Sequence, residues 1–300
     1  EAKTNEPEKK PQSDSKASPK AQKAKGGERE PIRQRTASTQ GPTGLMDIWS
    51  ADTGPEKTFR MRFSLAYFDA DDFPVKGTEN QFVGTDFSFA YTPHRIVEAF
   101  LNVRGTSNTN DGGAPQLLQT QGDLTLGAKV SDYVSDSIAI GGALALHFLS
   151  DLGKGGYDGG GTSVDLRMLT TFDLDKTNTA PLRIHIDLEY YFENSEVITE
   201  DFPEEPTLIQ EYGLQTARYD RLSFGLGFES PVHKYVSPFL EYRLSLPMLV
   251  ELSRRSEDSN DYSIADGVDT SSIPHFLTFG VRSFPIEELA IDLAMRLGLS

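Results

Sequence analysis

Apolar and polar residues alternate along short segments of this chain, and a turn follows nearly every segment. Residues 60–67, for example, read RMRFSLAY, so that every second residue is large and apolar while those between are charged or small. A period of two is typical of a β-strand with one apolar face. The pattern predicts eleven strands, which span 58–68, 82–92, 95–105, 117–130, 137–149, 162–174, 181–193, 218–230, 235–247, 275–284 and 288–299.

The connections between these strands alternate in length. Long connections, over 69–81, 106–116, 150–161, 194–217 and 248–274, alternate with short ones centred on 92–94, 131–136, 175–180, 231–233 and 285–287. Outer-membrane barrels have short periplasmic turns and longer extracellular loops. Each predicted strand also has the roughly 9–11 residues that a tilted strand needs to cross a bilayer. We therefore expect an all-β fold, a transmembrane antiparallel up-and-down β-barrel of about 12 strands, within a range of about 10–14.

The two faces of the predicted strands differ in charge. The outward face is apolar and uncharged, as in Val83, Phe87 and Phe89 of one strand and Leu293, Met295 and Leu297 of another. This is the face that lipid would contact, since an Arg or Lys at the bilayer midplane costs about 2–4 kcal/mol. The inward face is polar and carries charges of both signs.

From the inward face we predict a lumen charge network of Arg60, Arg62, Asp86, Glu98, Arg104, Asp123, Asp165, Arg167, Asp187, Glu189, Arg221, Glu241 and Arg243. The same face also holds Lys129, Arg183, Arg282, Arg296, Glu229 and Asp292. The two signs are nearly balanced, whereas a selective pore favours rings of one sign. The balance predicts a lumen largely filled by ion pairs. A small channel or porin is the alternative.

Composition removes several classes of function. The chain has 300 residues and no cysteine, which excludes disulfides, lipid-anchored cysteine and thiolate metal sites. No stretch approaches the roughly 18 apolar residues of a transmembrane helix. The net charge is −16, and the residues after 40 hold 19 basic and 39 acidic side chains. A body of that charge will not bind nucleic acid through its surface field.

The N-terminal region differs from the rest in composition. Residues 1–43 are rich in Lys, Pro, Ser and Glu and have almost no large apolar side chain, so we predict a disordered, basic periplasmic tail. The barrel would occupy 44–300, and Leu45–Ser50 would be either a strand or a segment folded into the barrel end. Because single-chain bacterial barrels have an even strand count, one further strand is needed. It is either Leu45–Ser50 or a strand following Ser300, and we favour the second.

Candidate chemistry is sparse. Of the histidines, only His147 and His185 are expected to face inward, near opposite ends of the barrel, too far apart to share a metal ion or a proton. No nucleophile stands at a recognisable spacing from a base. The acidic long loops could bind Ca²⁺ or Mg²⁺, but none matches an EF-hand, and a solvated acidic surface is the simpler interpretation. We expect no enzyme activity, no metal site and no cofactor.

Several segments carry a resemblance. Residues 41–46, 50–53, 89–100, 122–129 and 236–242 resemble the β-barrel region of OmpA-like outer-membrane proteins, mainly of myxobacteria and related Gram-negative groups. The resemblance implies an outer-membrane location and contact with lipid and lipopolysaccharide. It brings no catalytic motif. We expect a structural or cell-surface interaction role, with other cell-envelope proteins as candidate partners through the loops or the tail.

Overall fold

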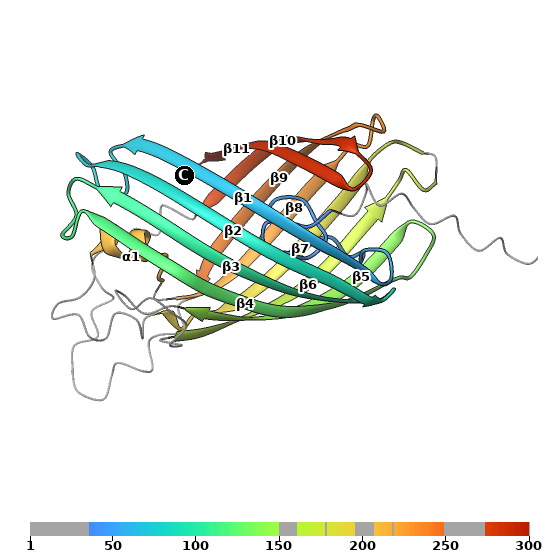
Figure 1. Ribbon diagram of the computed structural model, residues 1–300, viewed down its shortest axis with the longest axis horizontal. Coiled ribbons are helices and arrows are strands. Elements are labelled where there is room, and N and C mark those ends of the chain that lie inside the picture. Colours follow the sequence, from blue (N-terminus) through green and yellow to red (C-terminus); the bar gives the residue numbers. More distant parts are fainter. Residues whose placement is uncertain are drawn as a thin grey trace, which may run out of the picture. The chain divides into compact units, whose positions relative to one another are not determined.

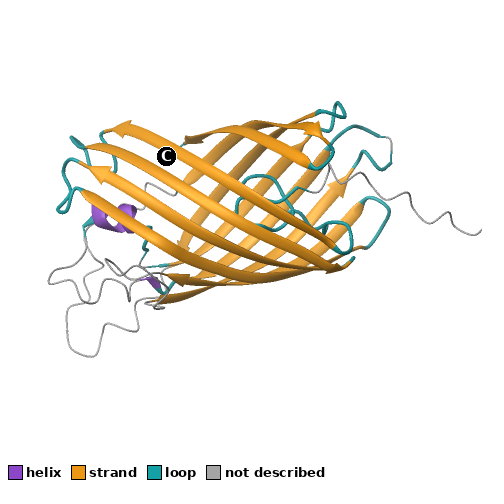
Figure 2. Ribbon diagram, viewed as in Figure 1, coloured by secondary structure: helices purple, strands orange, loops and turns teal. Residues whose placement is uncertain are grey.

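A computed structural model describes residues 36–149, 161–177, 179–195, 207–217, 219–248 and 274–299. Within these ranges the chain forms eleven strands and one short helix (Figures 1 and 2). The elements are β1 Thr58–Asp71, β2 Glu79–His94, β3 Val97–Asn110, β4 Leu117–Tyr133, β5 Ile138–Leu149, β6 Gly161–Asp173, β7 Arg183–Phe192, α1 Leu208–Leu214, β8 Asp220–Glu229, β9 Val236–Met248, β10 His275–Ile286 and β11 Leu289–Gly298. All eleven predicted strands are present, so the all-β antiparallel fold is confirmed.

Each strand pairs antiparallel with the next one in sequence, giving a single sheet in the order β1 to β11. The sheet curls in a barrel-like manner, with one convex and one concave face (Figure 1). The register places apolar residues opposite apolar residues and charged residues opposite charged residues, since Phe63 lies opposite Phe87 and Glu98 lies opposite Lys129. Because neighbouring strands share this alternation, the apolar side chains gather on the convex face and the polar ones on the concave face.

Solvent exposure confirms this division. On the convex face, Phe63 is 68%, Met168 is 70% and Leu293 is 81% exposed. On the concave face, Glu98 and Lys129 are fully buried. Charged groups are therefore inside and large apolar groups outside, the reverse of a protein that folds around an apolar core in water.

The helix α1 interrupts the connection between β7 and β8, which we expected to be a loop. A capping box joins Thr207 and Gln210 at its start. Its residues Ile209 and Leu214 are buried, and the ring of Tyr212 lies 4.8 Å from that of Phe73. The helix thus covers part of the long-loop end of the concave face. No helix in the described ranges has the length and apolar character needed to cross a membrane.

The strands β1 and β11 are the edges of the sheet. An odd number of antiparallel strands makes these two parallel to each other, and within the described residues no ladder joins them. Arg62 of β1 and Asp292 of β11 nevertheless form an ion pair of 2.7 Å on the concave side. Leu45–Ser50 forms no ladder with β11, so the interpretation of this stretch as a closing strand is wrong. It lies instead on the concave face.

The open edge can be tested with paired cysteines, because the chain has none of its own. We expect Phe63→Cys with Phe87→Cys to form a disulfide on mild oxidation, since these residues are opposite each other in the β1–β2 ladder. Phe63→Cys with Leu293→Cys should not, because a disulfide needs Cα atoms within about 7 Å and no ladder brings β1 and β11 together. Efficient cross-linking of the second pair, read from gel mobility, would show that the two edges meet.

Candidate functional site

The concave face is occupied by residues 36–57, which we call the inserted segment. Figure 1 shows this part of the chain, in blue, folded within the curl of the sheet ahead of β1. Its apolar residues Leu45, Ile48 and Trp49 are at most 1% exposed. Residues 36–43 fall in the region we predicted to be tail, but here they are part of this packed segment, and Thr43 is fully buried. The remainder of the predicted tail, 1–35, lies outside the described residues.

Both ends of the inserted segment lie at the short-turn end of the sheet. At one end, Arg62 near the start of β1 donates to the carbonyl of Ala37 at 2.7 Å. At the other end, the Thr53 hydroxyl donates to the carbonyl of Arg95 in the β2–β3 turn. Between them, Asp47 reaches Arg296 of β11, far from the short turns. The segment is therefore a loop that enters and leaves through the same end.

Glu98 of β3 binds both legs of this loop, that is, the stretch that leads into its far turn and the stretch that leads out of it. Its carboxylate accepts the backbone N–H of Thr43 at 2.7 Å and that of Gly54 at 3.2 Å. Arg60 of β1 donates to the same carboxylate at 2.6 Å. Because Glu98 is fully buried, these donors replace the water that an ionised carboxylate would otherwise require.

Lys129 of β4 lies opposite Glu98 in the ladder and binds the same two legs through oxygen atoms. Its ammonium donates to the carbonyl of Ser50 at 3.1 Å, to the carbonyl of Asp52 at 2.8 Å and to the hydroxyl of Thr43. The ammonium is also 3.5 Å from Glu98. Together Glu98 and Lys129 hold the donors and acceptors of the inserted segment's backbone.

Glu241 of β9 binds the far turn of the loop. One of its carboxylate oxygens accepts three consecutive backbone N–H groups, from Met46 at 3.0 Å, Asp47 at 3.0 Å and Ile48 at 2.9 Å. Successive N–H groups that converge in this way form an anion-binding nest. The turn therefore has a fixed position relative to β9.

Trp49 lies over the centre of the charge network. The Arg167 guanidinium is 3.8 Å from the centre of the Trp49 ring, and Phe100 meets that ring edge-on at 5.1 Å. Arg167 is paired with Asp165 and Asp187, each at 2.9 Å. Asp187 in turn accepts the backbone N–H of Trp49 at 3.2 Å. Arg167 and Asp187 thus pair with each other across the concave face of the sheet, which we call the wall, and also contact the inserted segment.

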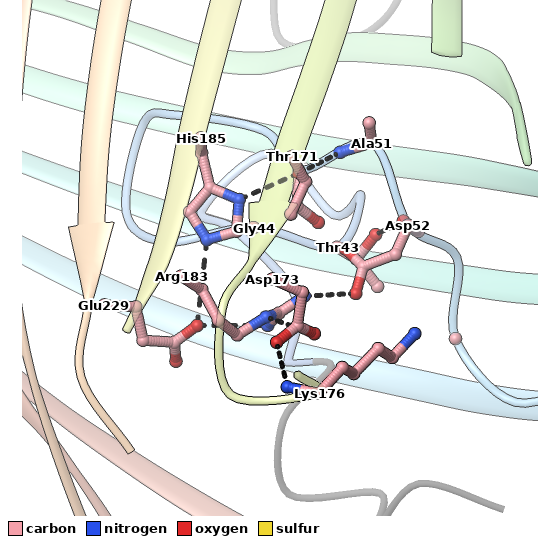
Figure 3. A network of polar contacts seen from close by, with 12 residues as sticks. Thr43, Gly44, Ala51, Asp52, Thr171, Asp173, Lys176, Arg183, His185 and Glu229 are labelled. Atoms are coloured by element: carbon pink, nitrogen blue, oxygen red, sulfur yellow. Dashed lines mark hydrogen bonds and ion pairs between the residues drawn. The ribbon is translucent and has the colours of Figure 1, made fainter. Parts of the chain in front are cut away.

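Arg183 of β7 joins three carboxylates near the short turns (Figure 3). It pairs with Asp173 at 3.3 Å, with Glu229 at 3.2 Å and with Asp52 of the inserted segment. The neighbouring turn holds Lys176, whose pKa is lowered to about 8 by burial and by the positive charge of Arg183. Lys176 therefore remains mostly protonated at neutral pH.

A hydrogen-bonded chain runs beside this cluster (Figure 3). The Thr171 hydroxyl accepts the N–H of Ala51 at 2.8 Å and lies 3.0 Å from Nδ1 of His185. Nε2 of His185 is 3.8 Å from Glu229. His185 thus faces inward as predicted, and it helps to fix the inserted segment through Thr171.

Two glycines of β8 make room for the apolar part of the loop. A Cβ at Gly225 would collide with Ile48, and one at Gly227 would lie 2.8 Å from the side chain of Leu45. Both positions face the concave side, where the neighbouring strands carry Asp187 and Arg243 beside Gly225, and His185 and Glu241 beside Gly227. The pair therefore forms a notch for Leu45 and Ile48.

Most of the predicted lumen charges meet at this site. Arg62, Glu98, Arg167, Asp187, Glu241 and Arg243 bond the inserted segment directly, Arg60 pairs with Glu98, and Asp165 and Glu189 pair with Arg167 and Arg243. The remaining four are Asp86, Arg104, Asp123 and Arg221. Asp86 accepts from Asn102 at 3.1 Å, Arg104 stands between Asp86 and Asp123 in the ladders, and Arg221 pairs with Glu193 at 3.3 Å while 42% exposed.

The predicted network omits several residues that organise the site. Lys129, Arg183, Glu229, Arg282 and Asp292 are assigned to the inward face but are not members of it. Asp47 and Asp52 are also missing from it, because they precede the first predicted strand. The inward glycines of β8 were the available signal, since two small residues on a charged face leave space that another part of the chain must fill.

No group of three or more His, Asp or Glu side chains in the described ranges is arranged to hold a metal ion. A comparison of the sequence with models of protein families found no match, and a comparison with curated proteins found none either. A functional assignment therefore depends on the geometry of the described residues.

Proposed function

We propose that this chain is an outer-membrane β-barrel of Gram-negative bacteria, similar to the barrels of OmpA-like proteins, whose lumen is closed by the inserted segment. Its role in this proposal is structural or interactive, with the long loops presented at the cell surface. The observation that carries the proposal is the inverted arrangement of the sheet, with an uncharged apolar convex face and a charged concave face bound to residues 36–57.

A bilayer accounts for the convex face. Large side chains such as Leu65 (68% exposed) and Met168 (70% exposed) occur on strand after strand. A water-facing surface rarely carries an apolar patch of more than a few hundred Å². The strands are 10–17 residues long, enough to cross the hydrocarbon core while tilted. Outer-membrane lipid and lipopolysaccharide are therefore the proposed partners of this face.

The orientation follows from the two ends of the sheet. In outer-membrane barrels the short turns face the periplasm. Both ends of the inserted segment lie at the short-turn end, which supports a periplasmic position for the N-terminal tail. Other cell-envelope proteins could then meet the tail on one side and the long loops on the other.

Met168→Arg tests the membrane location. In a bilayer, this mid-strand convex residue of β6 would lie near the midplane, and the substitution should cost about 2–4 kcal/mol of folding free energy. On a water-facing sheet, an exposed substitution would change stability by about 0.5 kcal/mol or less. Urea titration in lipid vesicles gives the value, with Lys57→Arg, at an exposed turn residue, as the control. A negligible effect, or recovery of the folded chain from the soluble fraction without detergent, would contradict the proposal.

The alternative function is a small channel. It is favoured by Arg221, a charged residue of the inward face whose side chain is 42% exposed. The ion pair of Arg221 is with Glu193, which lies outside residues 36–57. Planar-bilayer recording of the complete chain separates the two functions, because a closed lumen gives little steady conductance and a channel gives stable open levels.

A further inference from the structure

The wall binds the inserted segment mainly through its backbone. Backbone N–H groups of Thr43, Met46, Asp47, Ile48, Trp49, Ala51 and Gly54 donate to Glu98, Glu241, Asp187 and Thr171, and backbone carbonyls of Ala37, Gly44, Ser50 and Asp52 accept from Arg62, Arg282 and Lys129. Every polypeptide carries these groups. A segment that only filled the lumen would need no specific hydrogen bonds. Here side chains of the concave face bond both the N–H groups and the carbonyl groups of the folded segment.

Side chains add selectivity to this backbone recognition. Leu45 and Ile48 enter the notch left by Gly225 and Gly227, so that larger groups on β8 would exclude them. Trp49 stacks under the Arg167 guanidinium, which is a favourable cation–π geometry. Two acidic residues inside the segment, Asp47 and Asp52, each face an arginine. A ligand for this wall therefore combines an apolar pair, an aromatic ring and two acidic groups.

We propose that the concave face is a peptide-binding site and that residues 36–57 are its ligand, bound in cis. The chemical class of ligand is an acidic, turn-forming peptide of about the length of this segment, entering from the short-turn end. This goes beyond closure of the lumen, because a binding site retains its ligand and exchanges it without a covalent connection to β1. The proposal does not depend on the membrane, so it can fail while the membrane assignment stands.

The chain offers a direct test. Glu56 and Lys57, the last two residues of the segment before β1, have side chains 44% and 77% exposed, so a specific protease site inserted there is accessible. Trp49 is the only tryptophan and is 1% exposed, so its emission reports on the segment alone. After cleavage of the folded, detergent-solubilised protein, we expect the fragment to co-elute with the sheet and Trp49 to keep its blue-shifted emission. Immediate elution of the fragment with red-shifted emission would overturn the proposal.

Exchange provides the second measurement. A synthetic 36–57 peptide carrying Trp49→Phe should displace the cleaved fragment over time, lowering the buried tryptophan signal, while a scrambled peptide of the same composition should not. Equal displacement by both peptides, or no displacement by either, would contradict a selective site.

Lys129→Met should release the cleaved fragment about tenfold faster or more, because hydrogen bonds from a charged donor to both legs are lost. Lys76→Met, the same substitution at an exposed residue of the β1–β2 connection, is the control and should leave the release rate unchanged. The uncut Lys129→Met protein, with its Trp49 emission, separates release of the segment from failure to fold. An unchanged release rate in Lys129→Met would count against the assigned contacts.

Discussion

Arg183→Ala should lower the free energy of unfolding by about 3–5 kcal/mol, the largest effect expected of a single substitution in this chain. The guanidinium pairs with Asp52, Asp173 and Glu229, and all four side chains are at most 5% exposed. Alanine would leave three buried carboxylates without their shared cation. The cost is that of uncompensated buried charge, which exceeds the net value of the ion pairs themselves.

Denaturant unfolding of the protein in lipid vesicles at neutral pH measures this effect. The matched control is Arg95→Ala, because Arg95 also bonds a carboxylate, that of Asp132 at 3.1 Å, with the two side chains 67% and 48% exposed. A surface pair of this kind contributes about 0–1 kcal/mol. If Arg183→Ala costs no more than this control, the cluster is solvated and does not hold the inserted segment.

The sheet was predictable because its signal is local. A period of two over ten or so residues identifies a strand, and the same period assigns each residue to a face. In β6, for example, the alternation of Val164, Leu166 and Met168 with Asp165 and Arg167 determines both. Strand ends were less certain, and β2 begins at Glu79 rather than at the predicted residue 82.

The inserted segment was not predictable in the same way. Leu45–Ser50 has the composition of a short strand, and its true position depends on contacts with residues more than a hundred positions away, such as Glu241 with Ile48. A loop inside a sheet has no periodicity of its own. Only its surroundings mark it, through the glycine notch of β8 and through wall charges whose partners are backbone groups.

The individual ion pairs could not be predicted from the sequence for a related reason. The alternation assigns each charged residue to the inward face, but its partner depends on how far the side chain extends across neighbouring strands. The alternation places Arg183 on the inward face, yet its pairing with Asp52 requires the loop to be in place. Similarly, the alternation groups Arg221 with the lumen charges, although Arg221 pairs with Glu193 near a strand end.

Deletion of residues 37–54 should convert a barrel with little conductance into one with stable ion-conducting levels in planar bilayers. The loop carries the largest fully buried side chain of the concave face, that of Trp49, and it spans the interior from β3 to β11. Without it, the charged groups of the wall would face water, which hydrates them and admits ions. The control is deletion of residues 1–18, which removes the same number of residues outside the segment and should leave the conductance unchanged.

The outcomes of this experiment separate three arrangements of the interior. Conductance in the deletion variant alone identifies the inserted segment as the closing element. Conductance in both the complete chain and the 37–54 deletion variant would mean that ions pass beside the segment, as the channel alternative requires. Silence in a deletion variant that still shows heat-dependent mobility in SDS gels would assign closure to the long-loop end, where α1 already packs its buried Ile209 and Leu214 against the sheet. The loop is the expected answer, because buried charges of six strands (β3, β4, β6, β7, β9 and β10) are directed at it and not at the helix.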